Sequence, residues 1–212
     1  MRRLVIALTV SLWSFAAAAL EIHSPAHCLY GCPEGGPDTN DLVIREIYIL
    51  SSNDKTKFAD WVAYRVTSET IGRTKQRQWL KDPLLADNET LSPTDYAGAN
   101  EALGVDRGHQ ATLTSFTGTQ YWKDTNILSN ITPQKGELNQ GPWERLERAT
   151  HKIVEDGLAD EVYVMTGPLY QRTMPSLPKA KRPHVVPSGY WKVISVFRNG
   201  AVVTVGFIMD QN

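Results

Sequence analysis

The sequence lacks an excess of positive charge, internal repeats and low-complexity linkers. It has 22 basic and 23 acidic residues, and without the N-terminal Arg2 and Arg3 the counts are 20 and 23, a net charge of −3. A protein with this balance does not coat nucleic acid through bulk charge. Since no repeat or linker divides the 212 residues, their length suits one domain with a substantial core.

Long apolar runs are also absent, apart from one at the N-terminus. The first residues, MRRLVIALTVSLWSFAAAAL, combine a basic start, an apolar run and a small-residue end. The run is shorter than the roughly 20 residues that span a bilayer, so it favours a secretory signal peptide over a membrane anchor. Ala17 and Ala19 fit the A-x-A cleavage rule. We expect a signal peptide over residues 1–19, one domain over 20–212, a secreted or periplasmic location and no membrane association.

The only two cysteines, Cys28 and Cys32, follow this signal closely. In an exported protein such a pair predicts a short loop closed by a disulfide. The alternative is a zinc site in which His23 and His27 join the two thiolates. Export favours oxidation, and adjacent His27 and Cys28 are awkward joint ligands, so we expect the disulfide.

Basic side chains gather at two places despite the low net charge. The two clusters are Arg73, Lys75, Arg77 and Lys81, and Lys179, Lys181 and Arg182. Such clusters either grip a polyanion locally or are solvated loop charges. Clustering alone favours the second interpretation.

Hydrophobic periodicity predicts a mixture of strands and helices. Alternation of apolar and polar residues over 42–52 and 58–70 predicts two antiparallel strands, and the polar stretch from Gly72 to Pro93 predicts a long surface loop. Three further strands are expected at residues 161–170, 190–200 and 201–210. Because strands and helices do not alternate regularly, the fold class is α+β.

Two helices are expected between these groups of strands. A short one ends at Gly104, a suitable C-terminal glycine, and residues 115–126 are short helical or irregular. A longer helix is predicted over residues 139–155, with Pro142 in its first turn, where a missing N–H is harmless.

The sequence DRGHQA, which begins at Asp106, brings together side chains suited to phosphodiester hydrolysis. A neutral imidazole at His109 suits the activation of water, and Arg107 offers a planar donor fork for phosphate oxygens. Gly108 would let the backbone pass close to a bulky substrate, or it would itself adopt an unusual φ. A histidine beside charged residues is weak evidence alone, because most such histidines lie at the surface or in the core.

A second group of polar residues lies in LNQGPWERLE, at Asn139, Trp143 and Glu147. Their spacing by four puts them on one broad helix face. The amide oxygen of Asn139 is a hard ligand of the type Mg²⁺ accepts, and Glu147 would bind the waters of that ion. Alternatively, Asn139 caps the helix and Glu147 pairs with His151.

Taken together, DRGHQA, NILSNITPQ and LNQGPWERLE resemble the DNA/RNA non-specific endonuclease family, the ββα-metal nucleases. The similarity extends over nearly the whole expected mature chain, through CLYGCP, FADWVAY, YAGAN, VMTGPLY and YWKVI. The resemblance implies a secreted endonuclease that uses Mg²⁺, with Mn²⁺ as a second possible ion, and hydrolyses DNA and RNA to 5′-phosphorylated oligonucleotides. A homodimer and an inhibitor protein are both compatible with the sequence, which identifies neither.

The resemblance also implies a role for each motif residue. His109 is the general base and Asn139 the direct protein ligand of the metal, while Glu147 orients the water cluster around it. Arg107 and Arg77 stabilise the phosphorane-like transition state and the leaving oxygen. The resemblance further implies that Asp106 and Asn130 support the site. It implies a module of two strands and a helix, with His109 on or near a strand and the metal residues on the crossing helix.

The chain departs from the family pattern at two places. His151 stands where bacterial relatives carry an arginine, so we expect an auxiliary phosphate contact that is weaker or depends on pH. The sequence stops at VGFIMDQN, where secreted members continue, so we expect strands or an edge cover to be missing. The rival function is therefore a catalytically silent nucleic-acid-binding or interaction module that keeps the nuclease fold.

Overall fold

The computed structural model describes residues 26–211. The expected signal peptide, residues 1–19, lies outside the described residues, as does His23 of the alternative zinc site. Among the described residues, no helix combines the length and the hydrophobicity needed to cross a membrane.

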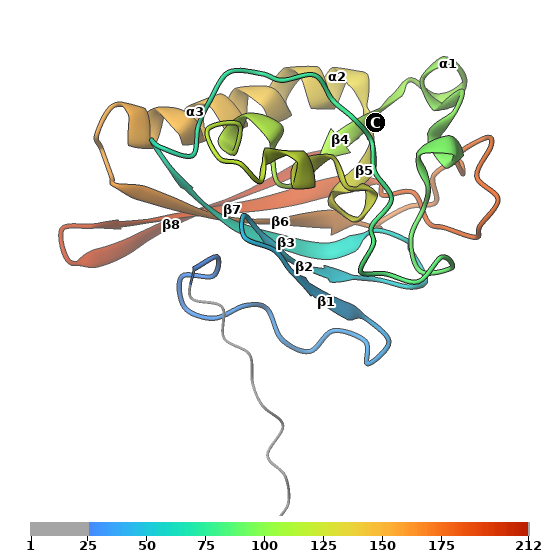
Figure 1. The fold of residues 1–212 in the computed structure, drawn as a ribbon, viewed down its shortest axis with the longest axis horizontal. Helices are drawn as coiled ribbons and strands as arrows, with labels where there is room; N and C mark the ends of the chain where they lie inside the picture. Colours follow the sequence, from blue (N-terminus) through green and yellow to red (C-terminus); the bar gives the residue numbers. More distant parts are fainter. Residues whose placement is uncertain (1–25, 212) are drawn as a thin grey trace, which may run out of the picture.

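A six-stranded antiparallel sheet forms the base of the molecule (Figure 1). Its strand order is β1-β2-β3-β6-β7-β8. The strands are β1 (Asp41–Ile44), β2 (Ile49–Ser52), β3 (Ala59–Thr67), β6 (Glu161–Leu169), β7 (Gly189–Arg198) and β8 (Ala201–Asp210). The last three strands lie where the sequence predicts them. The expected antiparallel pairing of the first two predicted strands is present between β2 and β3.

The helices and a two-stranded sheet lie on one face of this large sheet (Figure 1). In chain order they are η1 (Pro93–Tyr96), α1 (Ala99–Leu103), β4 (Val105–His109), η2 (Leu113–Ser115), η3 (Trp122–Asn126), η4 (Leu128–Asn130), β5 (Ile131–Lys135), α2 (Gly136–Leu138), the π-helical turn η5 (Asn139–Trp143) and α3 (Glu144–Glu155). Gly104 ends α1 with a φ of 64°, as its C-terminal position predicts. The architecture is α+β, as expected.

The main core lies between the large sheet and α3. Val154 of α3 is buried in it, and Leu146 and Ile153 pack against it, above the inner side chains of β3 and β6. Residues three or four apart share a helix face, so this packing turns the adjacent stripe of α3, with Glu147 and His151, toward the loops above the sheet. The hydrophobic face of the helix thus sets the direction of its polar residues.

The N-terminal segment packs on the opposite face of the sheet. Cys28 and Cys32 form a disulfide, and Cys28 is buried against Ile49 and Trp61. Because the disulfide uses both thiols, the expectation of a closed loop is confirmed. The loop attaches the segment before β1 to the sheet.

The predicted strand over 42–52 is wrong in one respect, because it is broken into β1 and β2. The backbone N–H of Arg45 donates to the carbonyl of Tyr48 at 2.9 Å and closes a turn between them. The Arg45 side chain donates to Asp82 at 2.6 Å, and the Tyr48 hydroxyl donates to the carbonyl of Asp124 at 2.9 Å. These partners are distant in sequence, so alternation within the segment does not reveal the turn.

The predicted helix over 139–155 is also interrupted. Gly141 has non-helical dihedrals, φ −112° and ψ −109°, and the regular helix α3 begins only at Glu144. Pro142 follows the kink directly; because proline lacks an N–H and its ring clashes with the preceding turn, it separates the two helical segments. Asn139 therefore lies on a separate helical turn from Glu147.

Candidate active site

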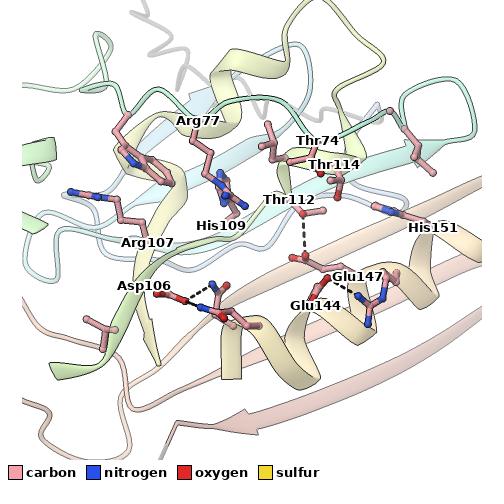
Figure 2. Close-up of a pocket in the computed structure, with 18 of the residues that line it drawn as sticks. Thr74, Arg77, Asp106, Arg107, His109, Thr112, Thr114, Glu144, Glu147 and His151 are labelled. Atoms are coloured by element: carbon pink, nitrogen blue, oxygen red, sulfur yellow. Dashed lines mark hydrogen bonds and ion pairs between the residues drawn. The ribbon is translucent and has the colours of Figure 1, made fainter. Parts of the chain in front are cut away.

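A cavity of about 740 Å³ opens between the loop after β3, strand β4 and helix α3 (Figure 2). Six of the predicted site residues line it. They are Arg77, Asp106, Arg107, His109, Asn139 and Glu147. Three separate segments thus bring their polar side chains into one space, although up to 70 positions separate them in the sequence.

Strand β4 positions the DRGH residues by pairing with β5. Gly108 lies opposite Thr132, next to Gln134 of β5, and its φ is not positive. A Cβ on Gly108 would lie 2.7 Å from the Cβ of Gln134, whose side chain is buried. The unusual φ suggested from the sequence is therefore wrong, and the close approach that requires glycine is to Gln134.

His109 is held as a neutral base in the wall of the cavity. It is 8% exposed, and its Nε2 lies 3.2 Å from the amide oxygen of Asn126. Since an amide oxygen only accepts, Nε2 carries the ring proton and Nδ1 keeps a free lone pair. Burial, opposed by the bond to Asn126 and aided by the charge of Arg77, lowers the pKa of His109 to about 4. The ring is consequently neutral at physiological pH.

Trp79 packs against both motif side chains of β4. The Trp79 ring centroid lies 5.5 Å from the His109 ring centroid and 5.3 Å from the guanidinium carbon of Arg107. Tyr96 lies 5.4 Å from the same guanidinium, whose Nη2 donates to the carbonyl of Pro93 at 3.1 Å. Arg107 is therefore fixed between two rings, whereas Arg77 extends from an exposed loop toward His109 (Figure 2).

Asp106 orients the proposed metal ligand rather than facing the base. Its carboxylate accepts hydrogen bonds from Asn139 Nδ2 at 3.0 Å, Gln140 Nε2 at 2.8 Å and Asn100 Nδ2 at 3.1 Å. A carboxylate accepts and an amide nitrogen donates, so Asp106 fixes which end of the Asn139 amide faces it. The oxygen of Asn139 is directed away from Asp106 and stays available as a ligand. The alternative that Asn139 caps the helix is wrong, since Leu138 and Trp143 occupy the N-cap positions and the Asn139 side chain donates to Asp106.

Glu147 lies between a hydroxyl and a buried ammonium group. Thr112 Oγ1 donates to its Oε2 at 3.0 Å (Figure 2), and Lys192 Nζ is 3.8 Å from its Oε1. Burial raises the pKa of Glu147, and Lys192 opposes that shift. Lys192 is 1% exposed and lies 3.9 Å from the Trp143 ring centroid; burial lowers its pKa to about 8. Glu147 has these partners instead of the predicted alternative, His151.

The donor set in the cavity fits a hard divalent cation. Asn139 supplies an amide oxygen whose orientation Asp106 fixes, and Glu147 supplies a carboxylate from the same side of the cavity. Mg²⁺ prefers such oxygen ligands and keeps several waters. A site with one direct amide ligand and a nearby carboxylate for the waters is compatible with these residues.

His151 and Asn130 have different positions from those of the catalytic group. His151 lines the cavity, is bonded to Ser115 Oγ at 2.7 Å through Nε2, and burial lowers its pKa to about 4. It is neutral at pH 7 and does not replace the charge of an arginine. Asn130 is fully buried; its amide exchanges two hydrogen bonds with the backbone of Ala111 and donates to the carbonyl of Thr125 at 2.9 Å.

The sequence patterns do not single out three residues that contact the proposed catalytic groups: Asn126, Trp79 and Lys192. Asn126 belongs to the NILSNITPQ motif, so its position in that motif was the available signal. Trp79 follows Arg77 by two residues in a predicted loop. Lys192 stands between apolar residues in a strand. Such alternation predicts that its side chain points to the polar, solvent-exposed face of the sheet. Only the packing of α3 on β7 reveals its proximity to Glu147.

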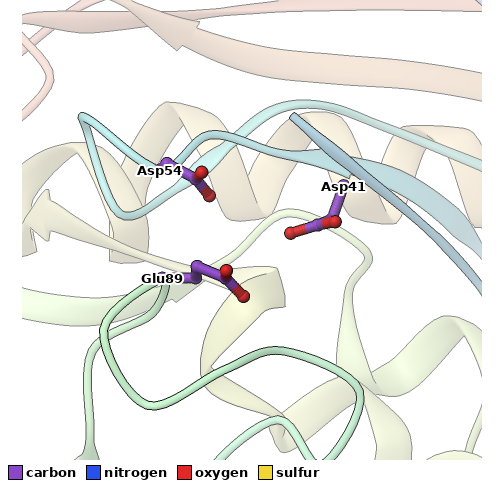
Figure 3. Close-up of side chains that lie close together, drawn as sticks. All are labelled: Asp41, Asp54 and Glu89. Atoms are coloured by element: carbon purple, nitrogen blue, oxygen red, sulfur yellow. The ribbon is translucent and has the colours of Figure 1, made fainter. Parts of the chain in front are cut away.

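A separate group of carboxylates lies outside the cavity. Asp41, Asp54 and Glu89 have ligand atoms within 4.8 Å of one another (Figure 3), and none lines the cavity. Loss of hydration raises the pKa of Asp41, and repulsion from Glu89 and Asp54 adds to the shift. Exposed acidic groups of this kind are common without a metal, and we assign this one no role.

An α+β fold whose cavity combines a neutral histidine, two arginines, an amide and a carboxylate suits a nucleic-acid hydrolase. The chain belongs to the DNA/RNA non-specific endonuclease family, whose sequence profile matches residues 24–212. The resemblance found in the sequence is thereby confirmed.

Individual relatives agree with the family assignment. The nuclease of Serratia marcescens is 46% identical over 209 residues, which cover 98% of this chain and 78% of that protein. The nuclease of a Nostoc species is 30% identical over 178 residues, covering 80% of this chain and 61% of that protein. Human mitochondrial endonuclease G is 31% identical over 140 residues, which cover 64% of this chain and 45% of that protein.

A solved structure shares the fold. The crystal structure of an EndoG/EndoGI complex aligns with a TM-score of 0.71 at 24% identity, covering 87% of this chain and 78% of that one. At this identity the likeness concerns the fold alone. The chain spans less than two thirds of the Nostoc nuclease and of human endonuclease G.

Proposed function

We propose that the protein is an exported, Mg²⁺-dependent endonuclease that hydrolyses DNA and RNA to 5′-phosphorylated oligonucleotides. The single observation that supports this most is the cavity in which His109, held neutral, faces the same space as Asn139 and Glu147. A base near an oxygen-ligand pair is what metal-assisted hydrolysis of a phosphodiester requires.

His109 acts as the general base. Its Nδ1 accepts a proton from a water molecule while the bond to Asn126 keeps the other nitrogen protonated. The water oxygen attacks phosphorus, and the bond between phosphorus and the 3′ oxygen breaks, so the phosphate remains on the 5′ end of the product. Trp79 limits rotation of the imidazole.

The arginines stabilise the charge that develops on the phosphate oxygens. Arg107 is pre-oriented by the two rings beside it, and such a fixed donor fork needs little reorganisation in the transition state. Arg77 approaches from the loop on the other side of His109 (Figure 2). Asp106 and Asn130 are positioning residues that act through Asn139 and through the chain after His109.

Asn139 and Glu147 would hold Mg²⁺, or Mn²⁺ in its place, with Asn139 as the direct ligand and Glu147 bound through water. When bound, the cation supplies positive charge for the phosphate and the leaving oxygen. Lys192 balances the charge of Glu147 from beneath.

Export is supported by the N-terminal sequence and by the Cys28–Cys32 disulfide, which suits an oxidising compartment. Secretion and a periplasmic location are equally compatible with this proposal. Nutrient scavenging or removal of extracellular nucleic acid are the uses that fit an exported nuclease.

The proposal is tested by incubating the protein with supercoiled plasmid and with RNA in the presence of Mg²⁺. We expect nicking of the plasmid and degradation of the RNA, both abolished by a chelator and restored by excess Mg²⁺. Product 5′ ends should accept a kinase label only after phosphatase treatment. Binding without cleavage at any Mg²⁺ concentration would instead support the silent nucleic-acid-binding module.

A further inference from the structure

A second cavity lies next to the catalytic one. It has a volume of about 630 Å³ and is lined by four consecutive loop residues, 75–78, and by Trp122. Arg77 lines both cavities. The second cavity therefore continues the first along the loop that follows β3.

Trp122 presents an aromatic surface already occupied by cations. Its ring is half-buried, Lys75 Nζ lies 4.9 Å from its centroid and Lys123 Nζ lies 5.9 Å from it. A tryptophan face in this position attracts either a cation or the flat face of a nucleic-acid base.

The element that carries Trp122 is held by hydrogen bonds and is connected to His109. Thr125 Oγ1 donates to the carbonyl of Trp122 at 2.7 Å, and Tyr48 of the sheet donates to the carbonyl of Asp124 at 2.9 Å. The same short helix η3 ends at Asn126, which binds His109 at 3.2 Å. The aromatic face thus has a fixed position relative to the reaction centre.

The loop beside it has a strong local positive charge. Arg73, Lys75 and Arg77 are exposed, and no acidic residue occurs between Glu69 and Asp82. Among the ion pairs of the described residues, none involves Lys75 or Arg77. These cations are free to contact phosphate in a protein whose overall charge is slightly negative.

We propose that Trp122, Lys75 and Arg77 form a nucleotide subsite for an unpaired stretch of the substrate strand. A base stacks on the Trp122 ring, Lys75 moves from the ring to a neighbouring phosphate, and Arg77 contacts the phosphate between this subsite and the catalytic cavity. The inference rests on the proposed nuclease function and adds the form of substrate that the site prefers. An acidic peptide would use the cations but not the ring.

The test measures binding and cleavage separately. Binding of a fluorescently labelled single-stranded oligonucleotide is measured in the His109→Ala background, with Trp122→Leu, Trp122→Phe and Lys75→Gln added one at a time. Stacking of one base predicts about 5- to 150-fold weaker binding for Trp122→Leu, whereas Trp122→Phe keeps an aromatic face and most of the affinity. Lys75→Gln should lower the salt slope of log K by roughly 0.7, the value for one phosphate on a single strand.

Cleavage is measured without the His109 change, on the oligonucleotide and on a p-nitrophenyl phosphodiester of a single nucleotide. Trp122→Leu should raise the KM for the oligonucleotide and leave the small substrate unaffected, because the latter does not reach Trp122. The matched control is Tyr121→Leu, which removes a neighbouring exposed ring that lines neither cavity.

Each outcome has a defined meaning. Unchanged oligonucleotide binding by Trp122→Leu, or equal loss with Tyr121→Leu, overturns the subsite. Equal loss on both substrates together with a lowered melting temperature shows a structural role and also overturns it. If the parent protein cleaves neither substrate, the proposed function fails, and the binding series still decides whether the subsite exists.

Discussion

Replacing Gly108 by alanine tests how strand β4 positions the catalytic side chains. The added Cβ would lie 2.7 Å from the Cβ of Gln134 and 3.1 Å from its Cδ, and would also meet its Oε1. Real Cβ atoms essentially never approach a carbon this closely, so the β4–β5 pair must separate or Gln134 must move. Arg107 and His109 flank Gly108, and both would shift with the strand.

The magnitude follows from the packing around Gln134. This side chain is 1% exposed and has little room to move. Overpacking by one methyl group in such a site costs about 1–3 kcal/mol of unfolding free energy. A shift of about 1 Å in a catalytic group costs roughly 100-fold in rate, so we expect activity to fall more than stability.

The assay combines urea unfolding with plasmid cleavage at saturating Mg²⁺. Gly136→Ala is the matched control, because the nearest atom to its added Cβ is Asp106 Oδ2 at 3.6 Å. The double variant Gly108→Ala with Gln134→Gly removes the clashing side chain and should regain part of the lost activity. Parental stability and rate in Gly108→Ala would refute the argument that Gln134 requires glycine at this position.

The other predictions concern charge, pH and the disulfide. Lys192→Met leaves Glu147 buried without its ion-pair partner and should cost about 3–5 kcal/mol in urea unfolding at pH 7. Because burial raises the pKa of Glu147, the loss should shrink as the pH falls and the carboxylate takes up a proton; a loss that does not depend on pH contradicts the pairing. Burial lowers the pKa values of His109 and His151 to about 4, so the unfolded state binds more protons than the folded state between pH 6.5 and 4. The free energy of unfolding should therefore fall by about 3 kcal/mol per histidine as the pH drops through that window. Replacing either histidine should remove its share of this pH dependence. Reducing the N-terminal disulfide, which closes a very short loop, should cost about 2 kcal/mol; an unchanged melt after complete reduction contradicts this.

Sequence patterns within a segment predicted the strands and helices that such patterns can mark. Burial alternates over the first residues of β6, and Gly104 ends α1 in the left-handed conformation that glycine adopts without strain. The break between β1 and β2 depends on Arg45 and Tyr48, whose partners lie in distant loops. Periodicity carries no information about such partners, so the turn was not predictable.

The candidate site divides in the same way. The motifs offered His109, Arg107, Asn139 and Glu147 as separate candidates. The family resemblance predicted that they share one site with Arg77, and the structure places all five along one cavity. The sequence did not reveal that a strand residue, Lys192, balances Glu147, because that contact arises from packing α3 across β7. Nor did it reveal that Asp106 fixes the amide of Asn139, since that contact depends on the pairing of β4 with β5 and on the turn that follows β5.

In the proposed mechanism, His109 supplies the base and Asn139 supplies the metal ligand. The most direct measurement is the Mg²⁺ dependence of plasmid cleavage by His109→Ala and by Asn139→Ala, with the fold of each verified by circular dichroism. His109→Ala should lose about 10²–10⁴-fold in rate at every Mg²⁺ concentration and still bind nucleic acid. Asn139→Ala should require a higher Mg²⁺ concentration and recover part of the rate there. Near-parental cleavage by His109→Ala at saturating Mg²⁺ would contradict the claim.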